Sequence, residues 1–163
     1  MTIFILRHGK AEPRRSKIAD AARDLTGKGR RDVRVVLERA RDAGMRVDVV
    51  LTSPLRRAVE SAAIAMETLD PQPRLIETNS LRPNQPATKV WEKLPEANTL
   101  LLVGHEPQLS SIVVFLLGAP ELRIRLKKGA LVCIQVEQVS ASPRGTLEWM
   151  LTPRLARPHS RKI

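Results

Sequence analysis

Aromatic side chains are scarce in this 163-residue chain, which has no tyrosine, two tryptophans and two phenylalanines. The hydrophobic core must therefore be built from Val, Leu, Ile and Ala, within an apolar content of 42% that is ordinary for a globular protein. Surfaces that bind single-stranded nucleic acid stack the bases on aromatic rings, and no nucleic-acid-binding motif is visible. We therefore do not expect nucleic acid to be the partner of this chain.

Cysteine and long apolar runs are also nearly missing. Cys133 is the only cysteine, which excludes an intrachain disulfide and a thiolate metal cage. The longest apolar run, residues 112–119, is far below the roughly 20 residues that span a bilayer. The opening "MTIFIL" is too short for a signal peptide and lacks a basic stretch before it. We expect a soluble, cytoplasmic protein with no membrane partner.

Acidic residues are outnumbered, with 17 Asp and Glu against 28 Lys and Arg. The net charge is +11 and the isoelectric point is about 11.0. Such a balance favours a polyanionic or phosphorylated partner: nucleic acid, a phosphate ester or an acidic protein surface.

Apolar periodicity predicts alternating strands and helices followed by a hairpin. We expect residues 1–153 to form a single domain and residues 154–163 to form a basic, mobile tail. The pattern predicts an α/β fold, a three-layer α/β/α sandwich around a mostly parallel mixed sheet. Buried strands are expected at 2–6, 47–53 and 99–105, and a short strand at 74–78. Helices are expected at 27–43, 54–70, 86–94 and 107–117, and hairpin strands at 130–139 and 146–151.

Three of the expected strands end in related polar residues. The first ends in Arg7-His8-Gly9, and the third strong strand ends in Gly104-His105-Glu106. The second ends in Ser53-Pro54, read as a helix N-cap and a first-turn proline, with Arg56 and Arg57 just behind. Ligands of open α/β sheets bind outside the carboxyl ends of the strands, and a helix N-terminus there favours an anion. We expect these side chains to converge on one edge of the sheet.

Each feature taken alone has a simpler explanation. A lone histidine at a strand end is usually solvated or hydrogen-bonded, arginines in so basic a chain are usually solvated, and Gly9 and Gly104 could merely permit tight turns. The occurrence of all these features together favours a functional site, because two of only three histidines follow buried strands directly beside a glycine. His159, in the tail, has no such setting.

Two histidines and two arginines suit a phosphoryl group. Arginine offers a planar fork of donors to its oxygens, and a neutral imidazole is a good nucleophile near pH 7. The other ring nitrogen must donate, as to a backbone carbonyl, and nearby arginines disfavour the imidazolium form. Zinc held by the two histidines and Glu106 is a weaker interpretation, because Arg7 and Arg57 would repel a cation. A Walker-type phosphate loop is absent from the sequence.

Four segments together resemble the histidine phosphatase superfamily, the phosphoglycerate mutase-like fold. They are "LRHGKAE" (6–12), "DLTGKGRRD" (24–32), "TSPLRRAVESA" (52–62) and "LLLVGHEPQLS" (100–110). The resemblance implies that His8 is the nucleophile that becomes phosphorylated and that Arg7, Arg57 and His105 bind the phosphoryl group. Gly9 and Ser53 are further candidates for contact with the phosphate. The family needs no metal or organic cofactor, so none is expected here.

Within the superfamily, the short length and the first and last motifs look most like the SixA-type phosphohistidine phosphatases. In the mutase pattern an acidic proton donor follows a leucine by two positions, and here Leu81 is followed by Pro83 at that place. Glu12, Glu77 and Glu106 are other possible donors. A missing acid matters less for a phosphoramidate, whose imidazole leaves neutral, than for an alkoxide.

We therefore expect a phosphatase with a phosphohistidine intermediate that acts on phosphohistidine in a signalling or phosphotransfer protein. Two alternatives stay open. One is a small-molecule phosphomonoesterase of the same superfamily, acting on a small phosphate ester. The other is a non-catalytic basic module, suggested by cations at 14, 15 and 17 and, in the tail, Arg154, Arg157, Arg161 and Lys162.

Overall fold

Six strands form one sheet in the computed structural model, which describes residues 1–15, 17–138 and 140–158. The order across the sheet is β3-β2-β4-β1-β5-β6, and β1 to β4 are mutually parallel while β5 and β6 are antiparallel to their neighbours. The sheet is thus mixed and mostly parallel, as predicted. The strands are β1 Thr2–Arg7, β2 Val49–Thr52, β3 Arg74–Glu77, β4 Thr99–Gly104, β5 Leu131–Gln138 and β6 Arg144–Leu151.

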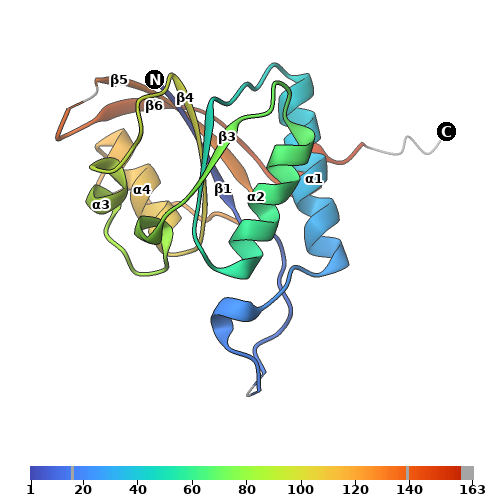
Figure 1. Cartoon of the computed structure of the whole chain (residues 1–163). Coiled ribbons are helices and arrows are strands. Elements are labelled where there is room, and N and C mark those ends of the chain that lie inside the picture. The colour runs from blue at the N-terminus through green and yellow to red at the C-terminus, as the bar shows by residue number, and fades with distance from the viewer. Residues whose placement is uncertain (16, 139, 159–163) are drawn as a thin grey trace.

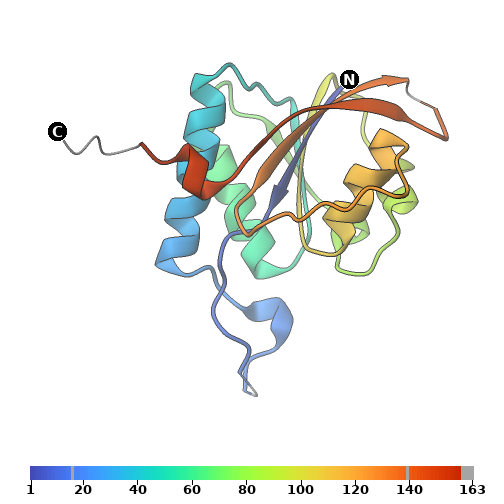
Figure 2. The same cartoon turned by 180° about the vertical axis from the view of Figure 1, so that it is seen from behind.

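Helices cover both faces of this sheet, which confirms the three-layer arrangement (Figures 1 and 2). The first face carries α1 (Gly27–Asp42), α2 (Arg56–Thr68) and the short α5 (Pro153–Ala156). The second face carries α3 (Ala87–Trp91) and α4 (Gln108–Leu117). Two single-turn 3₁₀ helices, η1 (Asp20–Ala22) and η2 (Asn79–Leu81), lie in the connections.

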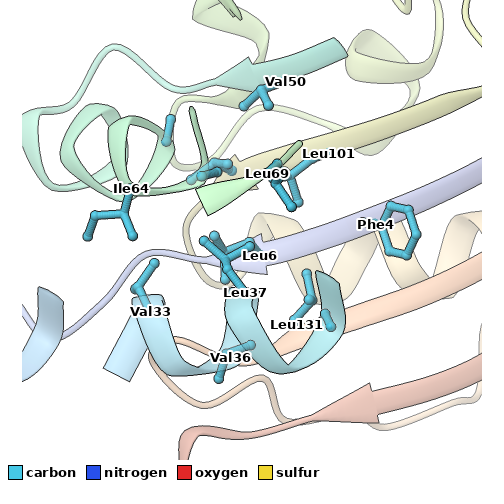
Figure 3. Packing of buried hydrophobic residues seen from close by; sticks show 14 of the residues in the cluster. Phe4, Leu6, Val33, Val36, Leu37, Val50, Ile64, Leu69, Leu101 and Leu131 are labelled. Atoms are coloured by element: carbon cyan, nitrogen blue, oxygen red, sulfur yellow. The ribbon is translucent and has the colours of Figure 1, made fainter. Parts of the chain in front are cut away.

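The central strands are buried on both faces, so they are continuous apolar runs. In β1, Phe4 and Leu6 join the core beneath α1 and α2 (Figure 3), whereas Ile3 and Ile5 join the core beneath α3 and α4. Leu, Ile, Val and Ala make up most of both cores, as the shortage of aromatic residues requires. Truncating one such buried Leu or Ile to Ala typically costs about 2–5 kcal/mol. Because the central strands are packed between two hydrophobic cores, the polar groups at their ends are held in fixed positions.

The expected cap of α2 is wrong. The helix begins at Arg56 and its N-cap is Leu55, which makes no side-chain capping bond. Ser53 stands before this turn, and its hydroxyl instead accepts from the backbone N–H of Leu55 and lies within hydrogen-bond distance of His105. A serine before a proline is typical of a helix N-cap, but here the hydroxyl of Ser53 is used in the contact with His105 instead.

The end of the chain differs from the expected mobile tail. Pro153–Ala156 form α5, Ala156 is buried against α1, and Arg157 pairs with the buried carboxylate of Asp32 on α1. Ala156 and Arg157, at the start of the expected tail, are thus in contact with α1. His159, Arg161 and Lys162 lie outside the described residues. Among the residues that the structure describes, no helix has the length and apolarity to cross a membrane.

Candidate active site

The carboxyl ends of β1 and β4 bring two buried histidines together. These strands are parallel neighbours in which Arg7 pairs with Gly104, so His8 and His105 follow at adjacent positions. Their ring centroids are 5.0 Å apart, with the ring planes at 55°. The side chains are nearly buried, with His8 6% and His105 2% exposed. The predicted convergence of the two strand ends therefore exists in the fold.

His8 is held by its own backbone in one tautomer. Its Nδ1–H donates to the carbonyl oxygen of Gly9 over 2.7 Å, because a carbonyl can only accept. Its Nε2 then carries the lone pair, and the Nε–H of Arg57 approaches it to 3.3 Å. Burial, and then the charges of Arg57 and Arg7, lower the pKa of His8 to about 3 against the opposing Gly9 bond. The ring is therefore neutral at neutral pH, with its free nitrogen beside a guanidinium.

His105 is oriented by the strand next to its own. Its Nε2 lies 2.8 Å from the hydroxyl oxygen of Ser53, at the end of β2. Its Nδ1 is buried and finds no hydrogen-bond partner among the described residues. Burial, followed by His8 and Arg57, lowers the pKa of His105 to about 3. Both rings are therefore uncharged in a strongly cationic setting.

Arg57 reaches the histidines from the first turn of α2. Besides its contact with His8, it donates from Nη1 to the Asp20 carbonyl over 2.7 Å and from Nη2 to the Asp20 carboxylate over 3.1 Å. Burial alone would raise the pKa of the Asp20 carboxyl, but Arg57 and Arg23 hold it below its usual range. A carboxylate of the 10–24 loop thus occupies donors that would suit a phosphate oxygen.

Arg7, the residue before His8, is held by the segment that precedes β5. Its Nη1 donates to the carbonyl of Leu126 over 2.6 Å, while its Nε is buried without a hydrogen-bond partner in the described part of the chain. Burial lowers the pKa of Arg7, and the carboxylate of Glu106 opposes that shift. The guanidinium is thus anchored at one end and has an unused donor at the other.

These groups line a cavity of about 440 Å³. Five basic side chains face two carboxylates on its walls, counting the residues that the structure describes. Burial and the nearby cations Arg7 and Arg23 lower the pKa of Lys128, as expected where like charges crowd together. An entering oxyanion would relieve this repulsion. The lining residues are Arg7, His8, Arg14, Asp20, Arg23, Arg57, Pro83, Asn84, His105, Glu106 and Lys128.

Gly9 and Ser53 lie behind the rings, outside this lining. The N–H of Gly9 donates to the hydroxyl of Ser61 and its carbonyl accepts from His8. A Cβ on Gly9 would lie 2.6 Å from the carbonyl oxygen of Gly29, so this glycine permits the chain to pass close to α1. Both residues therefore position the histidines.

Of the three glutamates considered as proton donors, Glu106 alone lines the cavity. One of its oxygens accepts from the Ser110 hydroxyl, and the other is buried without a described partner. Pro83, at the place where the resemblance locates an acid, also lines the wall. No group of three or more His, Cys, Asp or Glu suited to a metal ion occurs among the described residues.

Sequence reasoning missed Asp20, Arg23 and Lys128. They lie in irregular connections, where apolar periodicity carries no information, in a chain whose many basic residues hide any single one. The sequence order of the motifs gave no indication that the 10–24 loop folds back onto Arg57.

Comparison with known proteins decides the family. Residues 3–82 match the family model of the histidine phosphatase superfamily, branch 1. An uncharacterized protein of Picosynechococcus sp. is 33% identical over 140 residues, which cover 81% of this chain and 83% of the relative. The chain belongs to the histidine phosphatase superfamily. The family that the motifs indicated is thereby confirmed, and the first three motifs lie within the matched residues.

Solved structures of phosphatases share the fold. The protein histidine phosphatase SixA complexed with tungstate has a TM-score of 0.83 at 22% identity, covering 96% of this chain and all of its own. A phosphoserine phosphatase mutant of Entamoeba histolytica, in complex with phosphoserine, has a TM-score of 0.66 at 14% identity, covering 94% of this chain and 98% of its own. The chain is a phosphatase of this superfamily, and the alternative of a non-catalytic basic module is therefore wrong.

Proposed function

We propose that this histidine phosphatase removes the phosphoryl group from phosphohistidine on a protein, through a phosphorylated His8. One observation carries the proposal: the free Nε2 of a neutral, nearly buried imidazole is set beside Arg57 in a cationic cavity. An imidazole in this state is a nucleophile for phosphorus, and the surrounding cations stabilise the charge on the equatorial oxygens.

The reaction has two steps. In the first, the lone pair of His8 Nε2 forms a bond to phosphorus as the bond from phosphorus to the substrate nitrogen breaks. In the second, a water oxygen attacks phosphorus, the bond to Nε2 breaks, and inorganic phosphate leaves with the proton of water passing to solvent or to phosphate. The Nδ1–H bond to Gly9 persists in both steps, so His8 returns to the same tautomer.

We assign three donors to the phosphoryl oxygens. Arg7 Nε and His105 Nδ1 are buried without a described partner, and Arg57 would exchange the Asp20 carboxylate for the phosphoryl group. An unsatisfied buried donor typically costs about 1–3 kcal/mol, so the ligand-free site is poised to gain from an anion.

The leaving group supports phosphohistidine as the substrate. A substrate imidazole that carries a proton on its remote nitrogen departs neutral when the P–N bond breaks, whereas an alkoxide needs a proton. Pro83 on the cavity wall cannot supply one. The carboxylate of Asp20 is kept charged by Arg57 and Arg23, which makes it a poor acid. The relative SixA, by its name, acts on phosphorylated histidine in proteins.

The test is to trap the intermediate and compare substrates. Brief incubation with a radiolabelled phosphohistidine protein, followed by denaturation at high pH and peptide mapping, should locate the label on His8. His8→Asn should lose the label and at least about 10³-fold in kcat, whereas His159→Ala, which removes the third histidine, should keep both. Label on any other residue, or full activity of His8→Asn, would refute the proposal.

A small phosphate ester is the second candidate, because one observation favours it. Glu106 lines the cavity and has a buried oxygen without a described partner, so it is placed where an alkoxide leaving group would need a proton. Greater kcat/KM for small monoesters than for every phosphohistidine substrate would favour this candidate.

A further inference from the structure

A second, larger cavity opens between α4 and the segment that follows it. We call it the α4 groove; its volume is about 770 Å³. Val114 and Phe115 of α4 lie on one side, and Leu122 and Ile124 of the following segment lie on the other. Leu122 is 39% exposed, so part of its side chain is available to a ligand. The groove is therefore apolar, open to solvent and separate from the catalytic walls.

The α4 groove and the catalytic cavity are lined by nearby residues of the same two segments, 106–110 and 122–128. Pro107 lines the groove, while its neighbour Glu106 lines the catalytic cavity. The Ser110 hydroxyl contacts both Glu106 and the carbonyl of Ile124. Figure 2 shows the segment after α4 crossing the molecule in orange toward the carboxyl end of β1. A ligand in the groove would thus lie against the same two segments that contribute Glu106 and Lys128 to the catalytic cavity.

The same segment presents a row of cations. In residues 122–128, "LRIRLKK", Ile124 and Leu126 turn inward, while Arg123, Arg125 and Lys127 are exposed. None of these three cations has an ion-pair partner among the residues that the structure describes. Lys128, the next residue, lines the catalytic cavity. Unpaired basic charge therefore runs from the groove to the phosphoryl site.

We propose that the α4 groove docks an acidic, amphipathic segment of the phosphorylated protein. Its leucine-like side chains would enter the groove, and its carboxylates would face Arg123 and Arg125. This inference rests on the proposed function and adds the recognition of its substrate. Apolar burial would supply affinity, and charge complementarity would raise the rate of encounter and exclude basic partners.

The shape and lining favour a protein over other anionic partners. A nucleic acid would find only one cation, Arg123, among the described residues that line the groove, and the other lining side chains are uncharged. A membrane surface would favour apolar side chains that protrude, whereas here they line a concavity. A protein segment can place aliphatic side chains in the apolar groove and carboxylates against the exposed cations beside it.

The test measures docking without chemistry. Two fluorescent, unphosphorylated peptides of about 20 residues, long enough to span a small domain, carry leucines with either glutamates or lysines. Fluorescence anisotropy with the full chain, in saturating inorganic phosphate to fill the catalytic cavity, should show binding of the acidic peptide alone. Arg123→Glu combined with Arg125→Glu should weaken it at least tenfold. Arg74→Glu, at the exposed amino end of β3, is the matched control and should leave binding unchanged.

Two further measurements keep the inference falsifiable. Ser111→Trp, at an exposed position lining the groove, should also weaken the acidic peptide, and p-nitrophenyl phosphate turnover by all variants shows that they fold. Equal binding of both peptides, or no effect of the charge reversals, would overturn the docking surface. So would reversal-sensitive binding of an oligonucleotide or of phosphatidylserine vesicles without binding of the peptide. If the acidic peptide docks but its phosphohistidine form is not hydrolysed, the proposed function fails and the docking surface stands.

Discussion

At the scale of single residues, the site is set by neighbours close in the fold. His8 is oriented by the carbonyl of the next residue, and His105 by a serine on the adjacent strand. Both rings are uncharged because they are buried among cations. As a consequence, folding disfavours protonation of both rings.

Stability should therefore depend on pH in a defined window. The folded pKa of each ring, about 3, lies below the ordinary value of 6.5, so the unfolded chain binds more protons between these values. The free energy of unfolding should fall as the pH drops from 7 to 5, by up to about 1 kcal/mol per pH unit for each ring. Urea unfolding at pH 7, 6 and 5 measures this slope. The double variant His8→Asn, His105→Asn should flatten it; an unchanged slope would show that the rings are not the cause.

A variant at Glu106 should distinguish the two candidate substrates, a small phosphate ester and phosphohistidine on a protein. Glu106→Gln should lower kcat for an aryl- or alkyl-phosphate, if that carboxyl protonates the leaving oxygen, by about 10²-fold or more. Phosphohistidine turnover should change far less, because its leaving imidazole needs no proton. Steady-state kinetics of the same variant on both substrates provide the check, with Glu77→Gln, exposed and outside the cavity, as the control. Equal losses on both substrates would contradict this division.

At the scale of elements, the sequence predicts the strands and helices, which follow from the periodicity of apolar residues. It does not predict the contacts made by irregular segments. All the predicted strands exist. The three central parallel strands are evident in the sequence because buried strands must be apolar, and the hairpin is evident because its turn contains Gly, Pro and Ser. The roles of Ser53 and of the 10–24 loop depend on tertiary contacts that leave no local pattern. The short α5 escapes notice because its one buried alanine stands among basic residues.

The junction of β1 with α1 offers a matched pair of variants. A Cβ on Gly29 would lie 2.1 Å from the carbonyl oxygen of Lys10, whereas one on Gly27 would meet only an Arg31 nitrogen at 3.5 Å. Gly29→Ala should destabilise the protein by about 1–3 kcal/mol, despite the better helix propensity of alanine, and lower activity by displacing His8. Gly27→Ala should be neutral or slightly stabilising. Thermal unfolding and kcat are the readouts, and equal behaviour of the two variants would contradict the close approach.

At the scale of the whole molecule, the chain has a net charge of +11, and five of its basic side chains line the candidate active site. Binding of an oxyanion to the folded state alone stabilises it by mass action. Phosphate or tungstate at about 100 times its Kd should add about 2.7 kcal/mol, or roughly 5–10 °C in Tm. Arg57→Ala should abolish the shift, Arg74→Ala should retain it, and 1 M NaCl should reduce it. Differential scanning fluorimetry measures these shifts; an equal rise in the Arg57 variant would place the anion elsewhere.

Strand ends and connecting segments contribute different residues to the site. The two imidazoles stand at the ends of strands packed between two cores, whereas Arg14, Asp20, Pro83 and Lys128 belong to connections. Exchange of those connections would leave Nε2 of His8 in place while altering what can approach it. Substrate choice can therefore diverge among relatives without any change in bond-breaking chemistry, and swapping the 119–128 segment between paralogues is a direct route to new selectivity.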